Sequence, residues 1–343
     1  MTKRIFNLRN VVAIAACLAV TSMMFSGCKD ENGDDDENGN GNGTTTTSLE
    51  TWTKVEIPEL QEIFSVGFGD GKFVVGDNKG KLAVSSDNGK TWTVNPNNPW
   101  GAGRVYEIIY DVSRFVVVAA SETSPVSYTS TPSGTWTRAD IGGEDGPYRT
   151  IVRAGGYYVV AGYEDNLIYA SELSGAWSKG KITPTPDDGE TIFSIAHGNG
   201  TYVAVGIRGT IAYTTNPGGA WTVVNDRPFD NRSLNGVIFD GTRFVLVGTG
   251  NTIGYATNPA TWTNKSSTSY NSFFNGITLG KGIYVAVGNN ILYTSDPTSN
   301  WTAAKTQPFN METYAHAIAF GNNTFVAVGG SEGKGVIAYA TVK

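Results

Sequence analysis

A seven-bladed β-propeller is the fold class that the sequence predicts, and three observations support it. A tryptophan followed by Thr or Ser recurs seven times, with spacings of 40, 44, 41, 44, 41 and 39 residues. Each repeat holds short apolar segments separated by Gly, Asn or Asp turns, as four-stranded propeller blades do. The 343 residues include 43 glycines and only 16% charged residues, which is typical of packed sheets joined by tight turns. The repeated tryptophans are Trp52, Trp92, Trp136, Trp177, Trp221, Trp262 and Trp301.

The unit that ends at Trp221 shows the blade pattern most completely. Three short apolar segments, which begin at Phe193, Tyr202 and Thr210, precede its Trp221-Thr222 pair. The second segment is a continuous apolar run in the repeats, which predicts strands covered on both faces. The first segment, expected next to the axis, has a recurring small residue where tapering blades crowd together. These small residues are Ser65, Thr150, Ser194, Gly236, Gly276 and Ala317, and Glu107 takes the same position in the remaining repeat.

The two ends of the repeat region predict how the ring closes. The seventh unit, Ala315 to Thr341, stops after three expected strands and has no terminal Trp. The segment from Leu49 to Val55 carries an orphan Trp52-Thr53 strand before the first complete unit. We therefore expect the N-terminal strand to complete the last blade, because closure removes exposed sheet edges.

The N-terminus predicts export and lipidation. Lys3, Arg4 and Arg9 precede an apolar run, Val11 to Val20, which is too short for a permanent membrane span and is typical of a signal peptide. The following Phe25-Ser26-Gly27-Cys28 resembles a bacterial lipobox. The resemblance implies a signal peptide over residues 1–27 and a lipid on Cys28. An ordinary secretory signal with an incidental Cys is the alternative. Cys17 lies inside the removed segment, so neither a disulfide nor a Cys-based metal site is expected.

Residues 28–50 are expected to form a flexible acidic tether rich in Gly, Asn and Thr. The Lys29-Asp30-Glu31 start resembles the surface-export signal of Bacteroidetes lipoproteins, and an acidic spacer without a sorting role is the alternative. The expected location is therefore the outer membrane, either exposed on the cell surface or facing the periplasm. The tether carries seven acids and so accounts for most of the net charge of −6. The net charge is therefore a poor guide to the propeller itself. That charge argues against nucleic acid as a partner.

The segment Ser85-Ser-Asp87-Asn-Gly89-Lys-Thr91-Trp92 resembles the Asp-box of sialidase-like (BNR-repeat) propellers. Physically, an Asp in this pattern caps backbone amides of a turn, and the Trp packs between blades. In that family the boxes lie away from the active site, so the resemblance implies fold and not catalysis. The repeats also resemble propellers that help to assemble photosystem II, which are binding scaffolds, and twin-propeller xyloglucanases, whose cleft needs a second propeller.

Catalytic constellations are poor in this sequence. The Arg-Ile-Pro that sialidases keep near the first blade is missing, although Arg104, Arg149 and Arg232 fall near the expected starts of inner strands. His197 and His316 have no His or Cys companion at ligand spacing, so no metal or other cofactor is expected. Glu107 is expected to be a solvated channel carboxylate or a partner of Arg149.

The loops that enter each inner strand are the expected binding face. We expect a monomer that binds a protein or a glycan there without catalysis, and a glycan-active hydrolase or lyase on the same face is the alternative. Trp100 is the leading candidate because it is the one Trp outside the repeat series. The candidate binding residues are Trp100, Arg104, Tyr148, Arg227, Phe229, Arg232, Tyr270 and Phe309.

Overall fold

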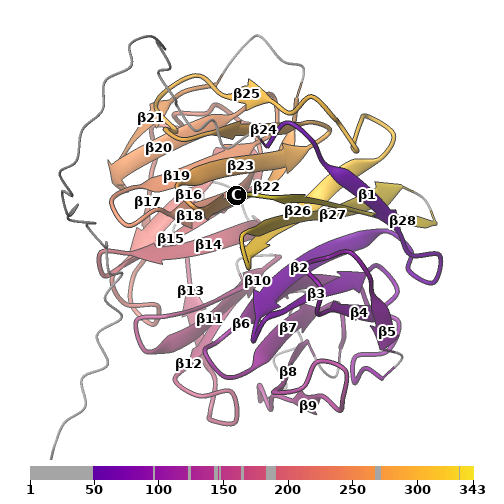
Figure 1. The fold of residues 1–343 in the computed structure, drawn as a ribbon. Helices are drawn as coiled ribbons and strands as arrows, with labels where there is room; N and C mark the ends of the chain where they lie inside the picture. The colour runs from indigo at the N-terminus through magenta and orange to yellow at the C-terminus, as the bar shows by residue number, and fades with distance from the viewer. Residues whose placement is uncertain are drawn as a thin grey trace, which may run out of the picture. The chain divides into compact units, whose positions relative to one another are not determined.

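The computed structural model is a ring of seven four-stranded antiparallel sheets (Figure 1). It describes residues 49–95, 97–122, 125–142, 146, 148–163, 166–182, 191–266, 272–331 and 333–343. The predicted signal peptide, Cys28 and nearly all of the predicted tether lie outside these ranges. The propeller begins slightly earlier than expected, because Leu49 is buried in its core and Glu50 forms an ion pair with Lys305.

Blades 1 to 6 each contain four strands that are consecutive in sequence and in space. Blade 1 is β2 (Ile63–Gly69), β3 (Lys72–Asp77), β4 (Leu82–Ser85) and β5 (Thr93–Asn95). Blade 2 is β6 (Val105–Tyr110), β7 (Phe115–Ala119), β8 (Val126–Thr129) and β9 (Thr137–Arg138). Blade 3 is β10 (Tyr148–Ala154), β11 (Tyr157–Gly162), β12 (Asn166–Ala170) and β13 (Ser178–Lys181).

Blade 4 is β14 (Ile192–Gly198), β15 (Thr201–Gly206), β16 (Ile211–Thr214) and β17 (Thr222–Val223), with a short 3₁₀ turn, η1 (Ile207–Gly209), after β15. Blade 5 is β18 (Leu234–Phe239), β19 (Phe244–Gly248), β20 (Ile253–Asn258) and β21 (Thr261–Asn264). Blade 6 is β22 (Phe274–Gly280), β23 (Ile283–Gly288), β24 (Ile291–Thr294) and β25 (Thr302–Ala303). None of the helical turns found in the described ranges is long and apolar enough to cross a membrane.

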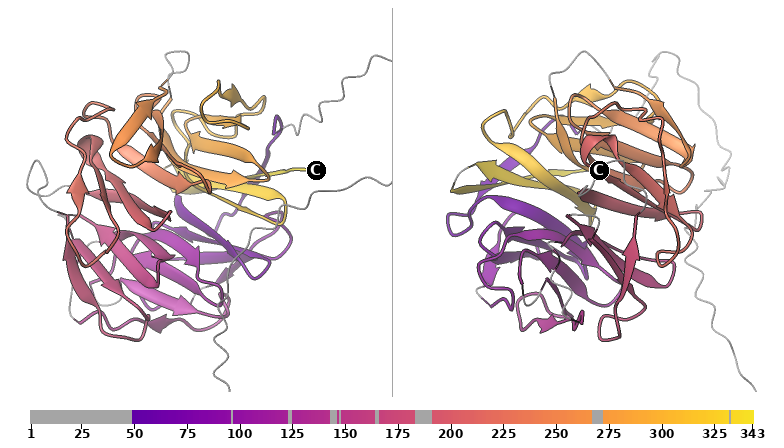
Figure 2. Two further views of the ribbon diagram at one scale, coloured as in Figure 1. Left: turned by 90° about the vertical axis from the view of Figure 1, so that its left-hand side faces the viewer. Right: turned by 180° about the vertical axis from the view of Figure 1, so that it is seen from behind.

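Blade 7 is built from both ends of the propeller, which confirms the predicted closure. It contains β26 (Tyr314–Gly321), β27 (Thr324–Ser331) and β28 (Lys334–Thr341), and its outer strand is β1 (Thr53–Glu56). Thr53 pairs with Tyr339 and Glu56 pairs with Val336. The indigo β1 therefore lies beside the yellow β28, and the blades surround one axis (Figures 1 and 2).

The core is divided among the junctions between blades. Seven hydrophobic clusters exist in the described residues, and each combines side chains of two neighbouring blades. The second strands are buried along almost their whole length, as their continuous apolar sequences predicted. A single blade thus has no core of its own, and its faces are covered only when both neighbours are present.

A second contact connects neighbouring blades at the far ends of the inner strands, and it takes two forms. In four junctions an aromatic ring packs over a glycine of the preceding blade, where a β-carbon would overlap the ring. These pairs are Phe68 on Gly321, Tyr110 on Gly69, Phe239 on Gly198 and Phe320 on Gly280. In the other three, a tyrosine hydroxyl donates to the preceding blade. These pairs are Tyr158 to the Asp111 carboxylate, Tyr202 to the Ala154 carbonyl and Tyr284 to the Asp240 carboxylate.

The turn predicted from Ser85 to Trp92 has the expected local hydrogen bonds. Asp87 Oδ1 accepts from the Thr91 backbone N–H at 2.9 Å, and Asp87 Oδ2 accepts from the Thr91 hydroxyl at 2.6 Å. Burial alone would raise the pKa of the Asp87 carboxyl, but these bonds and the one from the Ser85 hydroxyl outweigh it and lower the pKa to about 2. Trp92 donates its ring N–H to the Gly89 carbonyl and packs at the junction of blades 1 and 7. The carboxylate therefore fixes the shape of the turn.

Trp52→Ala tests the closing strand. Trp52 is 5% exposed and packs with Leu49 in the cluster shared by blades 6 and 7. Its removal should lower the melting temperature by roughly 10 °C, because truncation of a buried Trp costs about 3–5 kcal/mol. Circular dichroism melts measure the shift, and the exposed neighbour Thr53→Ala is the matched control. Equal melting temperatures for the two variants would contradict closure by this segment.

Candidate functional site

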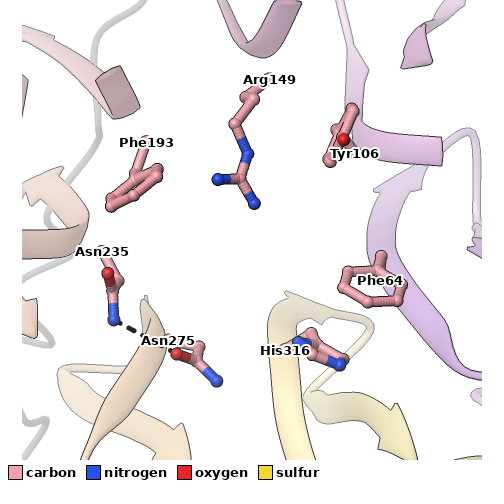
Figure 3. A pocket seen from close by; sticks show the side chains of 7 residues that line it. All are labelled: Phe64, Tyr106, Arg149, Phe193, Asn235, Asn275 and His316. Carbon is pink, nitrogen blue, oxygen red and sulfur yellow. Dashed lines mark hydrogen bonds between the residues drawn. The ribbon is translucent and has the colours of Figure 1, made fainter. Parts of the chain in front are cut away.

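Seven side chains, one from each blade, converge on the axis at the beginning of the inner strands (Figure 3). Figure 3 shows them arranged around an open centre. This end of the inner strands is the one entered by the inter-blade loops, so the site lies on the predicted face. We call these residues the axial ring. They are Phe64, Tyr106, Arg149, Phe193, Asn235, Asn275 and His316.

A β-bulge in every blade presents these side chains. In blade 1, Ile63 pairs with Asp77 and Ser65 pairs with Gly76, which leaves Phe64 without a partner in the second strand. The same register shift occurs in the other six blades, each time at the residue of the axial ring. A bulge inserts one unpaired residue and re-aims its side chain. The ring position is therefore free of the packing demands of the blade.

The axial ring is the mouth of a funnel along the propeller axis. The mouth encloses about 160 Å³, and a cavity of about 220 Å³ extends past the ring toward the middle of the inner strands. Below the mouth the wall contains five of the six small residues predicted from the sequence, with Glu107 among them. The five are Ser65, Ser194, Gly236, Gly276 and Ala317. Deeper still, the wall is aliphatic, with Val66, Ile108, Ile195, Val237, Ile277 and Ile318. The funnel is thus aromatic and polar at its mouth and apolar at depth.

Arg149 lies within a cage of aromatic rings at the mouth. Its Cζ is 4.7 Å from the Phe193 ring centroid, 5.0 Å from that of Tyr106 and 5.1 Å from that of Tyr163. Burial lowers the pKa of Arg149 and, together with a hydrogen bond to Tyr163, raises the pKa of Tyr106. Cation–π contacts of this kind orient the guanidinium without neutralising its charge.

Arg104 and His316 both contact Phe64. The Arg104 Cζ lies 3.9 Å from the Phe64 centroid, and the His316 ring is stacked on Phe64 with centroids 3.9 Å apart. His316 Nε2 is 2.8 Å from Glu62 Oε1. The hydrogen bond from His316 lowers the pKa of the Glu62 carboxyl. The Glu62 carboxylate is therefore already bonded to a side chain of the same protein, His316.

Asn235 and Asn275 connect neighbouring blades across the mouth. Asn235 Nδ2 donates to the Phe274 carbonyl at 2.8 Å and to Asn275 Oδ1 at 3.2 Å. Asn275 Nδ2 donates to the Ala315 carbonyl at 2.8 Å. These bonds hold both side chains in fixed orientations, with the amide N–H groups directed along the wall.

Glu107 is the one carboxylate among the described residues that line the funnel. It bonds to blade 3, where its Oε2 accepts from the Ile151 backbone N–H at 2.6 Å. Burial raises the pKa of its carboxyl to about 7, against the opposing effect of that hydrogen bond. Glu107 thus lines the channel, as one of the two sequence expectations had it, but its carboxyl is desolvated and held by the backbone of blade 3. Among the described contacts it forms no ion pair with Arg149, which was the other expectation.

Four predicted binding residues lie in the core. Trp100 is 4% exposed, donates its ring N–H to the Gly80 carbonyl and packs edge-on against Trp136. Tyr148, Phe229 and Phe309 are each 1% exposed. This placement corrects the expectation that they are presented on the loop face. The loops fold back over the blade ends, and their large apolar side chains fill the space beneath them.

The other predicted binding residues are dispersed. Arg104 reaches the axial ring, whereas Arg227 donates to Asn231 Oδ1 at 2.6 Å and Arg232 donates to the Gly250 carbonyl at 2.8 Å. Of the three arginines considered for a sialidase-like cluster, Arg104 and Arg149 share the Tyr106 ring and Arg232 is bonded elsewhere. Tyr270 lies outside the described residues.

Apart from Arg149, the axial ring was missed from the sequence. A usable signal existed, because each ring residue directly precedes the recurring small residue of the inner strand. In the described part of the chain, no group of three His, Cys, Asp or Glu side chains could hold a metal ion.

Comparisons with known proteins support the fold. No protein-family model matches the sequence, and no curated protein matches it. Among solved structures, YCF48 bound to D1 peptide has a TM-score of 0.65 at 16% identity, over 86% of this chain and 99% of that chain. A catalytically inactive virginiamycin B lyase from Staphylococcus aureus, with quinupristin, has a TM-score of 0.70 at 15% identity, over 85% and 99%. The WD40 propeller domain of Doa1 has a TM-score of 0.63 at 12% identity, over 86% and 97%. Identities this low show a shared fold alone.

Glu107→Gln tests the electrostatics of the funnel. A carboxyl whose pKa rises on folding stabilises the protein below its unfolded pKa and loses that contribution as pH rises through its folded pKa. Glutamine keeps an oxygen for the Ile151 N–H and carries no charge. The stability of the variant relative to wild type should therefore increase by about 3 kcal/mol between pH 4.5 and pH 8. Urea unfolding at both pH values measures it, and a pH-independent difference would contradict the buried carboxyl.

Proposed function

We propose that this chain is a cell-envelope lipoprotein whose propeller binds a protein partner at the axial funnel, without catalysis. The observation that carries the proposal is the axial ring. Seven bulged positions, independent of blade packing, gather aromatic, amide and guanidinium groups around one cavity. Such groups supply contact area and directed hydrogen bonds, as protein-binding surfaces do.

The composition of the funnel wall favours binding over glycan hydrolysis. Hydrolysis by the usual glycosidase mechanisms needs two carboxyl groups on either side of the bond to be cleaved. Glu107 is the single described carboxylate in the wall, and Glu62 is engaged by His316. A glycan remains the alternative ligand, because the rings at the mouth could also stack on sugars.

One similar fold supports a protein partner, because YCF48 is seen with a D1 peptide. The location rests on the sequence alone, through the basic N-terminus, the apolar run and the Cys28 lipobox resemblance. Together these features support our proposal that the funnel lies outside the cytoplasm, on a tether anchored by lipid.

Site-specific photocrosslinking in the native host tests the proposal. A benzoylphenylalanine at position 193, on the axial ring, should give a discrete protein adduct because its side chain lies at the mouth of the funnel. The same group at position 112 is the matched control. Val112 is 84% exposed on the β6–β7 hairpin, at the opposite end of the inner strands.

Adducts at position 112 alone, or at neither position, would contradict a protein-binding funnel. Binding of the wild type to a glycan array, lost in Phe193→Ala, would favour the glycan alternative. Fractionation of the same cells tests the anchor, since Cys28→Ser should move the protein out of the membrane fraction.

A further inference from the structure

Two guanidinium groups, those of Arg104 and Arg149, lie at the mouth of the funnel, and Arg104 is near enough to Glu62 to help lower the pKa of that carboxyl. Arg104 and Arg149 form no ion pair with any carboxylate in the described ranges, whereas Arg114 and Arg243 pair with Asp111 and Asp240. Nor does either side chain donate a hydrogen bond to another described residue. Burial desolvates Arg149, and desolvated charges in proteins are normally paired. Because no described carboxylate pairs with Arg149 in this ligand-sized cavity, its position indicates that a ligand supplies the anion.

The cage determines which part of Arg149 a ligand can reach. The Arg149 Cζ lies over the rings of Tyr106 and Phe193, and the N–H donors of a guanidinium lie along its edge, in its own plane. Figure 3 shows the group projecting between Phe193 and Tyr106 toward the centre of the ring. A planar edge with parallel N–H donors matches the two oxygens of a carboxylate.

The other groups of the mouth are compatible with an anion. Asn235 donates both amide N–H groups and Asn275 donates one to the neighbouring blade, and His316 is held by Glu62. The raised pKa of Glu107 leaves a large share of its carboxyl uncharged near neutral pH, so it repels an anion weakly. The volume at the mouth, about 160 Å³, accommodates a side-chain-sized group.

We infer that the funnel binds a carboxylate of an acidic side chain on the protein partner, with the edge of Arg149 as its main contact and Arg104 adding positive charge. This inference deepens the proposed function and rests on it. Arg149 is then the residue that determines specificity, and the aromatic rings around it orient its guanidinium.

Titration of the full chain with small probes tests the inference. The probe is N-acetyl-glutamate amide, and the isosteric N-acetyl-glutamine amide is the neutral control. The Arg149 Nε–Hε resonance, followed by NMR, should shift saturably with the glutamate probe and remain unchanged with the glutamine probe. Arg149→Gln should weaken binding of the glutamate probe by about tenfold or more, because a charge-assisted hydrogen-bonded pair is lost.

Two further variants separate a local effect from a folding defect. Arg149→Lys keeps the charge without the planar edge and should bind with intermediate affinity. Arg227→Gln, which removes a loop arginine bonded to Asn231, should bind like wild type. Equal binding of both probes, or unchanged affinity in Arg149→Gln with a wild-type melting curve, would overturn the inference.

Other anions give distinct outcomes. Tighter binding of glucuronate than of the glutamate probe would replace the acidic side chain with an acidic sugar, and tighter binding of inorganic phosphate would replace the carboxylate. Failure of the inference is distinguishable from failure of the proposed function. Crosslinking at position 193 without carboxylate binding would reject only the inference, and carboxylate binding without a protein adduct would reject only the protein partner.

Discussion

Mutual coverage of blade faces is the constraint on which the rest of this structure depends. Each hydrophobic cluster belongs to a junction, so a blade is stable only between two neighbours. The Trp52 strand satisfies this requirement for the last blade by pairing with β28. At the far ends of the inner strands, glycine–aromatic contacts and tyrosine hydrogen bonds then fix each junction. In each junction the aromatic residue and its partner fit each other. The Tyr110 ring lies over Gly69, which has no side chain, and the Tyr284 hydroxyl donates to the Asp240 carboxylate.

The same constraint creates the site. Crowding at the axis demands small side chains one residue after the bulge, as at Ser65 and Ser194, whereas the bulged residue itself points away from the packed faces. Residues as different as Arg149 and Asn275 can therefore occupy equivalent places without disturbing the blades. The ring of bulges therefore presents different side chains on a uniform scaffold. Arg149, which has no carboxylate partner among the described residues, is the one to which we assign ligand binding.

The fold could be predicted from the sequence because its determinants are local and repeated. The tryptophan spacing gave the number of blades, the missing last strand gave the closure, and Asp87 gave the geometry of one turn. The site was less predictable. Trp100 stands outside the repeat and was expected on the surface, but its burial depends on how its loop folds over Gly80, which no local pattern encodes. The axial ring was missed because a bulge moves one residue per blade, and the residues it presents do not repeat.

A crystal structure of the full chain with bound N-acetyl-glutamate amide tests the central claim most directly. We predict that both carboxylate oxygens lie within hydrogen-bonding distance of the Arg149 guanidinium, inside the ring formed by Phe64, Tyr106 and Phe193. A carboxylate bound on another surface would contradict it. So would an Arg149 that is paired with a carboxylate of its own chain.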